Sequence, residues 1–130
     1  MKTLYIVRGL AGSGKSTLAE KLAPDHNYSA DDFFVNQWGV YIFNPKLLPD
    51  AHDVCLKNVF DAMKAGAEVI AVANTFSQTW EAKGYLIAAK DYGYQVNIIE
   101  CQNDFGSIHD VPAETISRMK DRWEPIGREV

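Results

Sequence analysis

The chain has 130 residues, the usual size of a single domain, and its 47% of hydrophobic residues is enough to form one core. A formal charge of −4 excludes a protein that coats nucleic acid, because such proteins bind phosphates through a basic surface. No apolar run approaches the roughly 20 residues that a membrane-spanning helix needs. We therefore expect one domain over residues 1–130, located in the cytoplasm and without a membrane partner.

The first expected element is a strand over residues 3–7, and the loop GLAGSGKST follows at residues 9–17. This loop fits the pattern G-x-x-x-x-G-K-[ST], whose glycines allow successive backbone N–H groups to point at one phosphate. A helix is expected from Thr17 to about Ala23, where Pro24 stops it. The N-terminus of that helix carries a partial positive charge. The order of strand, glycine loop and helix predicts a nucleoside-triphosphate site.

The loop supplies the residues that are expected to bind the nucleotide, namely Gly12, Ser13, Gly14, Lys15, Ser16 and Thr17. Lys15 is predicted to be catalytic, because its ammonium group would reach the β- and γ-phosphates. The hydroxyl of Ser16 is the expected ligand of Mg²⁺. The sequence therefore predicts a nucleoside triphosphate and Mg²⁺ as ligands, although no motif reads the base.

A weak second strand over residues 27–30 leads into Asp31 and Asp32. We predict that Asp31 is the general base that deprotonates an acceptor hydroxyl. Asp32 is expected to hold a substrate group or a metal-bound water. The alternative is that the two aspartates only cap a turn or the next helix.

Aromatic residues are dense after this pair, at Phe33, Phe34, Trp38, Tyr41 and Phe43. We favour the interpretation that these rings pack beneath a loop, since aromatic side chains most often belong to the core. The alternative is a platform on which a base or a sugar stacks.

The rest of the chain alternates helices and strands. This pattern predicts an α/β fold with a parallel sheet of about four strands covered by helices on both faces, the three-layer form of P-loop NTPases. The expected elements are a helix start at Asn44-Pro45, a long helix from about Asp50 to Ala65, a strand over 68–73, a helix over 79–92 capped by Ser77, a strand over 94–101, a loop over 102–110 and a last helix from residue 111.

Ligands of parallel sheets bind at the carboxyl ends of the strands. Asp31-Asp32, Asn74-Thr75 and the loop 102–110 should therefore converge on the phosphate loop. Asn74 stands where a carboxylate often orients metal-bound water, and we expect it to bind substrate; an ordinary capping asparagine is the alternative. Arg8 is expected to bind substrate or to anchor Asp31.

Several segments occur together in the order that a known family shows: residues 8–17, 29–34, 41–45, 51–52, 73–75, 80–81, 93–94 and 111–124. They resemble a family of small P-loop kinases that includes the 5′-hydroxyl kinase domain of bacteriophage polynucleotide kinase and the NEDD-binding-protein-like ATPases of eukaryotes. The resemblance implies ATP binding and transfer of the γ-phosphate to a polynucleotide 5′-hydroxyl. It also places Asp31 at the position of the general base.

The chain departs from this family at three places. Phe34 replaces an arginine of the phage kinase, and Ala73 replaces an aspartate of the eukaryotic branch. The loop 102–110 contains no Arg or Lys, whereas the family has an arginine-rich lid. Two alternatives to a polynucleotide kinase therefore stay open: a nucleotide-binding protein with little catalysis that acts through a protein partner, and a kinase for a small metabolite or antibiotic.

Overall fold

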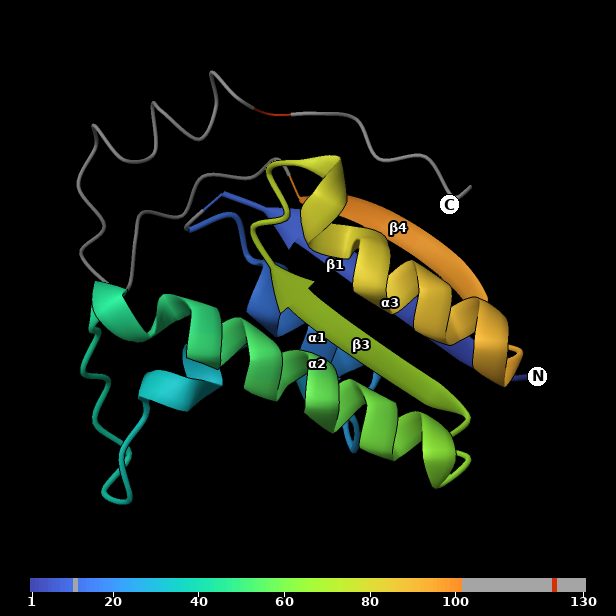
Figure 1. Ribbon diagram of the computed structural model, residues 1–130, viewed down its shortest axis with the longest axis horizontal. Coiled ribbons are helices and arrows are strands. Elements are labelled where there is room, and N and C mark those ends of the chain that lie inside the picture. Colours follow the sequence, from blue (N-terminus) through green and yellow to red (C-terminus); the bar gives the residue numbers. More distant parts are fainter. Residues whose placement is uncertain (11, 102–122, 124–130) are drawn as a thin grey trace.

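A parallel sheet forms the centre of the molecule, seen in a computed structural model that describes residues 1–10, 12–101 and 123 (Figure 1). In this part of the chain the sheet has four strands in the order β2-β3-β1-β4, and every neighbouring pair is parallel. The strands are β1 (Thr3–Gly9), β2 (Asn27–Tyr28), β3 (Val69–Asn74) and β4 (Gln95–Cys101). The predicted α/β fold is confirmed.

Helices cover both faces of the sheet. Helices α2 (Leu48–Lys64) and α3 (Thr79–Tyr92) lie side by side on one face, and α1 (Lys15–Leu22) lies behind the sheet in Figure 1. Alternate residues of a strand point to opposite faces, so Leu4 and Ile6 pack with α2 and α3 while Val7 packs with α1. Both faces of the central strands are buried, which explains why these strands are continuously apolar.

The contact between α1 and the sheet is made largely by alanines. Ala19 of α1, Ala71 and Ala73 of β3, and Ala23 just after α1 are all buried in the same cluster. Small side chains allow a helix to approach a sheet closely. This contact fixes the start of α1, and with it the phosphate loop, over the carboxyl ends of β1 and β3.

Helix boundaries differ slightly from the predictions. Helix α1 begins at Lys15, two residues before the predicted Thr17, because Gly14 acts as its N-cap in a left-handed conformation. Asn44 is a cap, as predicted, but of a short 3₁₀ helix, η2 (Pro45–Leu47), where its side chain accepts from the Lys46 N–H over 3.1 Å. Helix α2 then starts at Leu48 rather than near Asp50.

The predicted span of α3 is confirmed, but its predicted cap is wrong. Gln78 rather than Ser77 is the N-cap, and its N–H donates to Glu81 Oε2 over 2.8 Å. The Ser77 hydroxyl also donates to Glu81 Oε2, over 3.0 Å. A single carboxylate therefore accepts hydrogen bonds from two residues at the start of the helix.

Two predicted elements, the loop over 102–110 and the last helix from residue 111, lie outside the described residues. Within the ranges 1–10 and 12–101, no helix is both long enough and apolar enough to cross a bilayer.

Candidate active site

The phosphate loop connects the end of β1 to the start of α1. Gly12 and Gly14 have φ angles of 81° and 86°, a left-handed conformation that glycine adopts without steric cost. The N–H of Ser13 donates to the carbonyl oxygen of Leu10 over 3.1 Å and tightens the turn. A side chain at Gly9 would overlap the Ser13 hydroxyl, so this position also requires glycine. The loop thus has the curled backbone that phosphate binding requires.

Lys15 is the first residue of α1, and its side chain folds back over the loop. Its Nζ donates to the carbonyl oxygen of Leu10 over 3.4 Å. Burial lowers the pKa of Lys15, and the negative charge of Asp31 acts against that effect. The two predicted catalytic side chains therefore interact electrostatically across the same edge of the sheet.

Asp31 and Asp32 occupy the 3₁₀ helix η1 (Ala30–Phe34), and they have different surroundings. Asp32 completes a capping box, because its Oδ2 accepts from the Ser29 N–H over 3.1 Å while the Ser29 hydroxyl caps the helix. Asp31 Oδ1 instead accepts from the hydroxyl of Tyr41 over 3.3 Å. The capping alternative thus describes Asp32, whereas Asp31 interacts with Tyr41 and the loop lysine. Because Ser29 starts η1, β2 ends at Tyr28, earlier than predicted.

A small cavity of about 40 Å³ lies between α1 and η1. It is lined by Ser16, Ala19, Glu20, Asn27, Tyr28, Ser29, Asp32 and Ala73. Burial raises the pKa of Asp32, and the nearby charges of Asp31 and Glu20 raise it further. Ala73 stands where the eukaryotic branch has an aspartate, and the carboxylate of Asp32 lines the same cavity as Ala73.

These residues fit a magnesium ion of the kind that nucleotides bring. Mg²⁺ commonly takes only one or two ligands from protein and the rest from water and phosphate oxygens. The cavity offers the Ser16 hydroxyl together with the Asp32 carboxylate. Within the part of the chain that the structure describes, no group of three or more acidic, cysteine or histidine side chains gathers to form an all-protein metal cage.

Asn74 lies at the carboxyl end of β3, and its amide is used inside the protein. Its Oδ1 accepts from the Ala30 N–H over 2.8 Å, and its Nδ2 donates to Cys55 Sγ over 3.7 Å. Asn74 is only 5% exposed. It therefore fixes the backbone immediately before Asp31, whereas the sequence predicted a contact with substrate.

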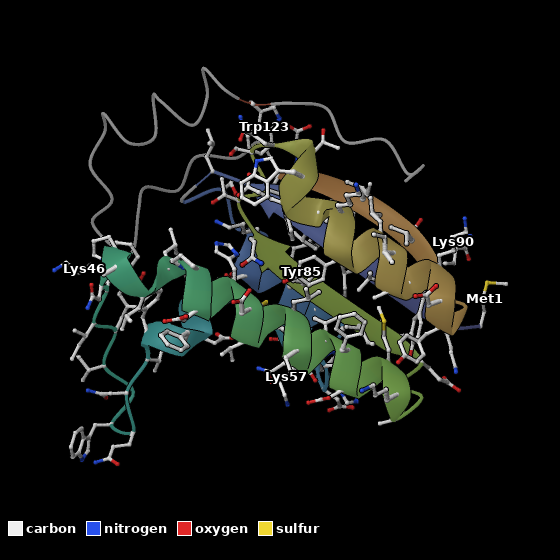
Figure 2. The ribbon with its side chains drawn as sticks, in the orientation of Figure 1. Met1, Lys46, Lys57, Tyr85, Lys90 and Trp123 are labelled. Carbon is white, nitrogen blue, oxygen red and sulfur yellow. The ribbon has the colours of Figure 1, made fainter. Side chains whose placement is uncertain are left out.

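Arg8 is also buried, although the sequence predicted that it binds substrate or anchors Asp31. Its Nε and Nη2 donate to the carbonyl oxygen of Phe76, over 3.1 Å and 2.5 Å. Its guanidinium stacks on the ring of Trp123, 3.9 Å from the centroid; Trp123 is labelled in Figure 2. Phe76 has a φ of 48°, which is unusual for a residue other than glycine. Arg8 thereby holds the turn between β3 and α3.

The aromatic segment is partly core and partly surface. Phe34 is buried and packs edge-on against Phe33, Tyr41 and Phe43. Trp38 is 77% exposed at the tip of a short hairpin, in a turn with Gly39. The favoured interpretation of core packing therefore holds for Phe34 but not for Trp38. Sequence reasoning missed the contact of Tyr41 with Asp31, because ring spacing gives no sign of where a hydroxyl points.

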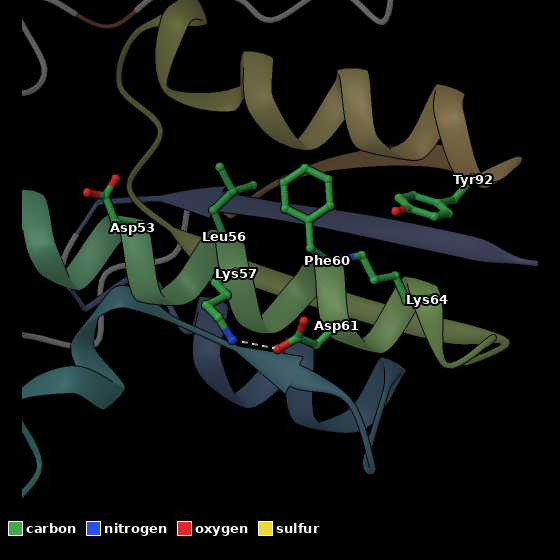
Figure 3. A pocket seen from close by; sticks show the side chains of 7 residues that line it. All are labelled: Asp53, Leu56, Lys57, Phe60, Asp61, Lys64 and Tyr92. Carbon is green, nitrogen blue, oxygen red and sulfur yellow. Dashed lines mark hydrogen bonds and ion pairs between the residues drawn. The ribbon is translucent and has the colours of Figure 1, made fainter.

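A larger groove of about 400 Å³ is lined by residues of α2 and α3, and no residue of the phosphate loop lines it (Figure 3). Leu56, Phe60 and Tyr92 form its apolar wall, while Asp53, Lys57, Asp61 and Lys64 stand at its edges. Its lining residues come from helices and not from the carboxyl ends of the strands. This groove is therefore separate from the predicted site at Lys15 and Asp31, although it is larger than the cavity between α1 and η1.

The chain belongs to the family described as the AAA domain, whose model matches residues 4–105. It is also 32% identical to NEDD4-binding protein 2 of Homo sapiens over 93% of this chain. The chain spans 8% of that protein's length. The resemblance predicted from the sequence is confirmed.

Many solved structures have a similar fold, among them the following two. One is a chain of the Pnkp1/Rnl/Hen1 RNA repair complex, with a TM-score of 0.59 and 21% identity over 93% of this chain and 37% of that chain. The other is a gluconokinase from Sinorhizobium meliloti, with a TM-score of 0.58 and 15% identity over 95% of this chain and 75% of that chain. These likenesses show that the chain has a P-loop kinase-like fold.

Proposed function

We propose that the chain is an ATP-dependent kinase that transfers the γ-phosphate to a hydroxyl group, either a polynucleotide 5′-hydroxyl or that of a nucleotide-like acceptor. One observation carries this proposal: Lys15 folds back over a curled glycine loop, with its Nζ 3.4 Å from the Leu10 carbonyl oxygen, and it lies near enough to Asp31 for that carboxylate to oppose the fall of its pKa. Phosphoryl transfer requires from the protein a cation that binds the phosphates and a carboxylate that acts as general base, and these two segments supply both groups.

The reaction follows from these two groups. The N–H groups of the loop and the ammonium group of Lys15 hold the β- and γ-phosphates and stabilise their charge. The acceptor oxygen attacks the γ-phosphorus, its proton passes to the carboxylate of Asp31, and the bond to the β–γ bridging oxygen breaks to release ADP. The Ser16 hydroxyl and the Asp32 carboxylate would hold a Mg²⁺ ion, directly or through a water, and the ion would neutralise part of the phosphate charge.

The acceptor class is supported by exposed aromatic rings. Phe33, Trp38 and Phe43 are 37%, 77% and 49% exposed, and Phe33 is in η1 with Asp31. An aromatic ring close to Asp31, the proposed general base, offers a surface on which the terminal nucleotide of a strand can stack. The likeness to a chain of an RNA repair complex agrees with this class of acceptor.

The test is a transfer assay with γ-labelled ATP and Mg²⁺ over a panel of acceptors. The panel contains RNA and DNA oligonucleotides with 5′-hydroxyl ends, nucleosides, gluconate and other small alcohols. We expect label on the 5′-hydroxyl oligonucleotides and none on matched strands that already carry a 5′-phosphate. Label only on a small alcohol would identify a metabolite kinase, and label on no acceptor would contradict the kinase proposal.

A nucleotide-binding protein that acts through a protein partner is the second candidate. It is favoured by eight exposed, large apolar side chains that are gathered between residues 33 and 48: Phe33, Val35, Trp38, Val40, Ile42, Phe43, Leu47 and Leu48. Such gatherings often mark interaction surfaces. This candidate predicts ATP binding without labelling of any acceptor in the panel.

A further inference from the structure

The hydroxyl of Tyr41 donates a hydrogen bond to Oδ1 of Asp31, over 3.3 Å. Burial first, and then the negative charge of Asp31 and the hydrogen bond to it, raise the pKa of Tyr41 to about 12. The hydroxyl therefore keeps its proton at neutral pH. Tyr41 acts as a permanent donor to one of the two oxygens of the Asp31 carboxylate.

The position of Tyr41 is fixed by its backbone and by its ring. Tyr41 forms an antiparallel bridge with Val35, and the next N–H, that of Ile42, donates to the Phe34 carbonyl oxygen over 2.8 Å. Its ring stacks on Phe43, with the planes 5° from parallel and the centroids 6.4 Å apart. The bond to Phe34 ties the tyrosine to η1, which is the same short helix that carries Asp31.

The backbone of Asp31 is fixed independently. Its N–H donates to the Ser29 hydroxyl over 3.1 Å, and the preceding N–H, that of Ala30, donates to Asn74 over 2.8 Å. These two contacts fix the backbone at Asp31, but they do not fix the side-chain torsion angles that orient its carboxylate. The hydrogen bond from Tyr41 acts on that rotation.

We propose that Tyr41 is a positioning residue for Asp31. Its hydroxyl fixes the plane of the carboxylate so that the oxygen not bonded to Tyr41 takes the proton of the acceptor hydroxyl. This inference rests on the proposed function, because it assigns Tyr41 a part in the same phosphoryl transfer. Tyr41 itself neither accepts nor releases a proton in the reaction.

The first experiment measures steady-state kinetics of Tyr41→Phe with ATP and a 5′-hydroxyl RNA oligonucleotide. Tyr41→Phe removes a hydrogen bond to a charged carboxylate, and the loss of such a bond at the general base should lower kcat about tenfold. The KM for ATP should not change, because the phosphate loop is intact. In an Asp31→Asn background, Tyr41→Phe should lower the residual kcat no further, since the base that it positions has been removed.

Tyr94→Phe is the matched control. The Tyr94 hydroxyl also makes one hydrogen bond, to the Ala67 carbonyl oxygen over 2.6 Å, but it lies where β4 begins, at the opposite end of the sheet. Its removal should lower thermal stability and leave kcat within about twofold of the original value. If Tyr41→Phe and Tyr94→Phe leave kcat equally unchanged, the positioning role of Tyr41 is overturned.

A second experiment tests the contact without any turnover. Thermal melting is measured for Tyr41→Phe, Asp31→Ala and the double variant. Residues in direct contact give non-additive changes, so the double variant should lose about 3 °C less than the sum of the single losses. Additive losses would overturn the inference. If the parent protein labels no acceptor, the proposed function fails, and this melting cycle still decides whether Tyr41 holds Asp31.

Discussion

Burial and the charge of Asp31 have opposite effects on the pKa of Lys15. Burial lowers its pKa and thus favours the neutral amine, while the charge of Asp31 favours the ammonium form. The triphosphate of a nucleotide would bring further negative charge to the same place. The cation should therefore be most stable when both the carboxylate and the phosphates surround it.

Replacing Lys15 with alanine should weaken the binding of Mg-ATP by at least about 100-fold, because several charge-assisted hydrogen bonds to phosphate are lost. Isothermal titration calorimetry measures this affinity. Lys21→Ala is the control, since Lys21 is an exposed cation in the last turn of the same helix. Equal affinities for the two variants would show that Lys15 does not touch the nucleotide.

Arg8 gives a prediction about stability rather than binding. Arg8→Met keeps the apolar stem of the side chain but leaves the buried Phe76 carbonyl oxygen without its two guanidinium donors. We expect the free energy of unfolding to fall by about 2–4 kcal/mol, as for other broken buried charge-assisted bonds. Urea denaturation measures this loss. A large loss of ATP affinity with unchanged stability would instead favour the substrate-binding role predicted from the sequence.

At the scale of elements, the start of α3 depends on one carboxylate. Glu81 Oε2 accepts from both the Ser77 hydroxyl and the Gln78 N–H. Glu81→Ala should therefore lower the free energy of unfolding by about 1–2 kcal/mol, measured by urea denaturation. Asp91→Ala, which removes an acidic group near the other end of α3, should cause no loss, because an anion there opposes the helix dipole. Similar losses in both variants would contradict the capping account.

The boundaries of a helix or strand could be predicted where a residue such as glycine or proline ends the element. Gly93 ends α3 in a left-handed conformation, and a glycine that follows a run of helix-forming residues is a common helix stop, so the end of α3 could be predicted. The wrongly predicted element boundaries lie where side chains form hydrogen bonds with backbone groups. Ser29 begins a capping box that stops β2 at Tyr28, and Gln78 takes the cap position that a serine usually fills. A strand pattern alone does not reveal such hydrogen bonds.

At the scale of the whole molecule, parallel topology brings separate segments to one edge of the sheet. The sequence predicted that Asp31-Asp32, Asn74-Thr75 and the loop 102–110 converge on the phosphate loop. The Ala30–Asn74 hydrogen bond and the effect of Asp31 on the pKa of Lys15 agree with this for Asp31 and Asn74, whereas the loop 102–110 lies outside the described residues. The individual contacts could not be predicted. Arg8 and Phe76 are 68 residues apart in the chain, and Tyr41 and Asp31 are 10 apart, so no periodic pattern links them.

Nucleotide binding should stabilise the folded chain as a whole. A ligand that binds only the folded state adds about 2.7 kcal/mol of stability at 100 times its dissociation constant. For a chain of 130 residues this corresponds to a rise in Tm of about 8 °C, measured by differential scanning calorimetry with Mg-ATP. Chelating the metal with EDTA should reduce the rise if the cavity at Ser16 and Asp32 binds Mg²⁺ with the nucleotide, as we propose. An unchanged Tm at saturating Mg-ATP would contradict a nucleotide site.

The most direct test of the account compares the parent chain with Asp31→Asn in a single-turnover transfer of labelled phosphate from pre-bound ATP to a 5′-hydroxyl RNA. Because asparagine cannot accept the proton of the acceptor hydroxyl, the account predicts a rate about 10²–10⁴-fold lower with ATP affinity unchanged. Equal transfer rates for the two proteins would contradict the assignment of Asp31 as the base.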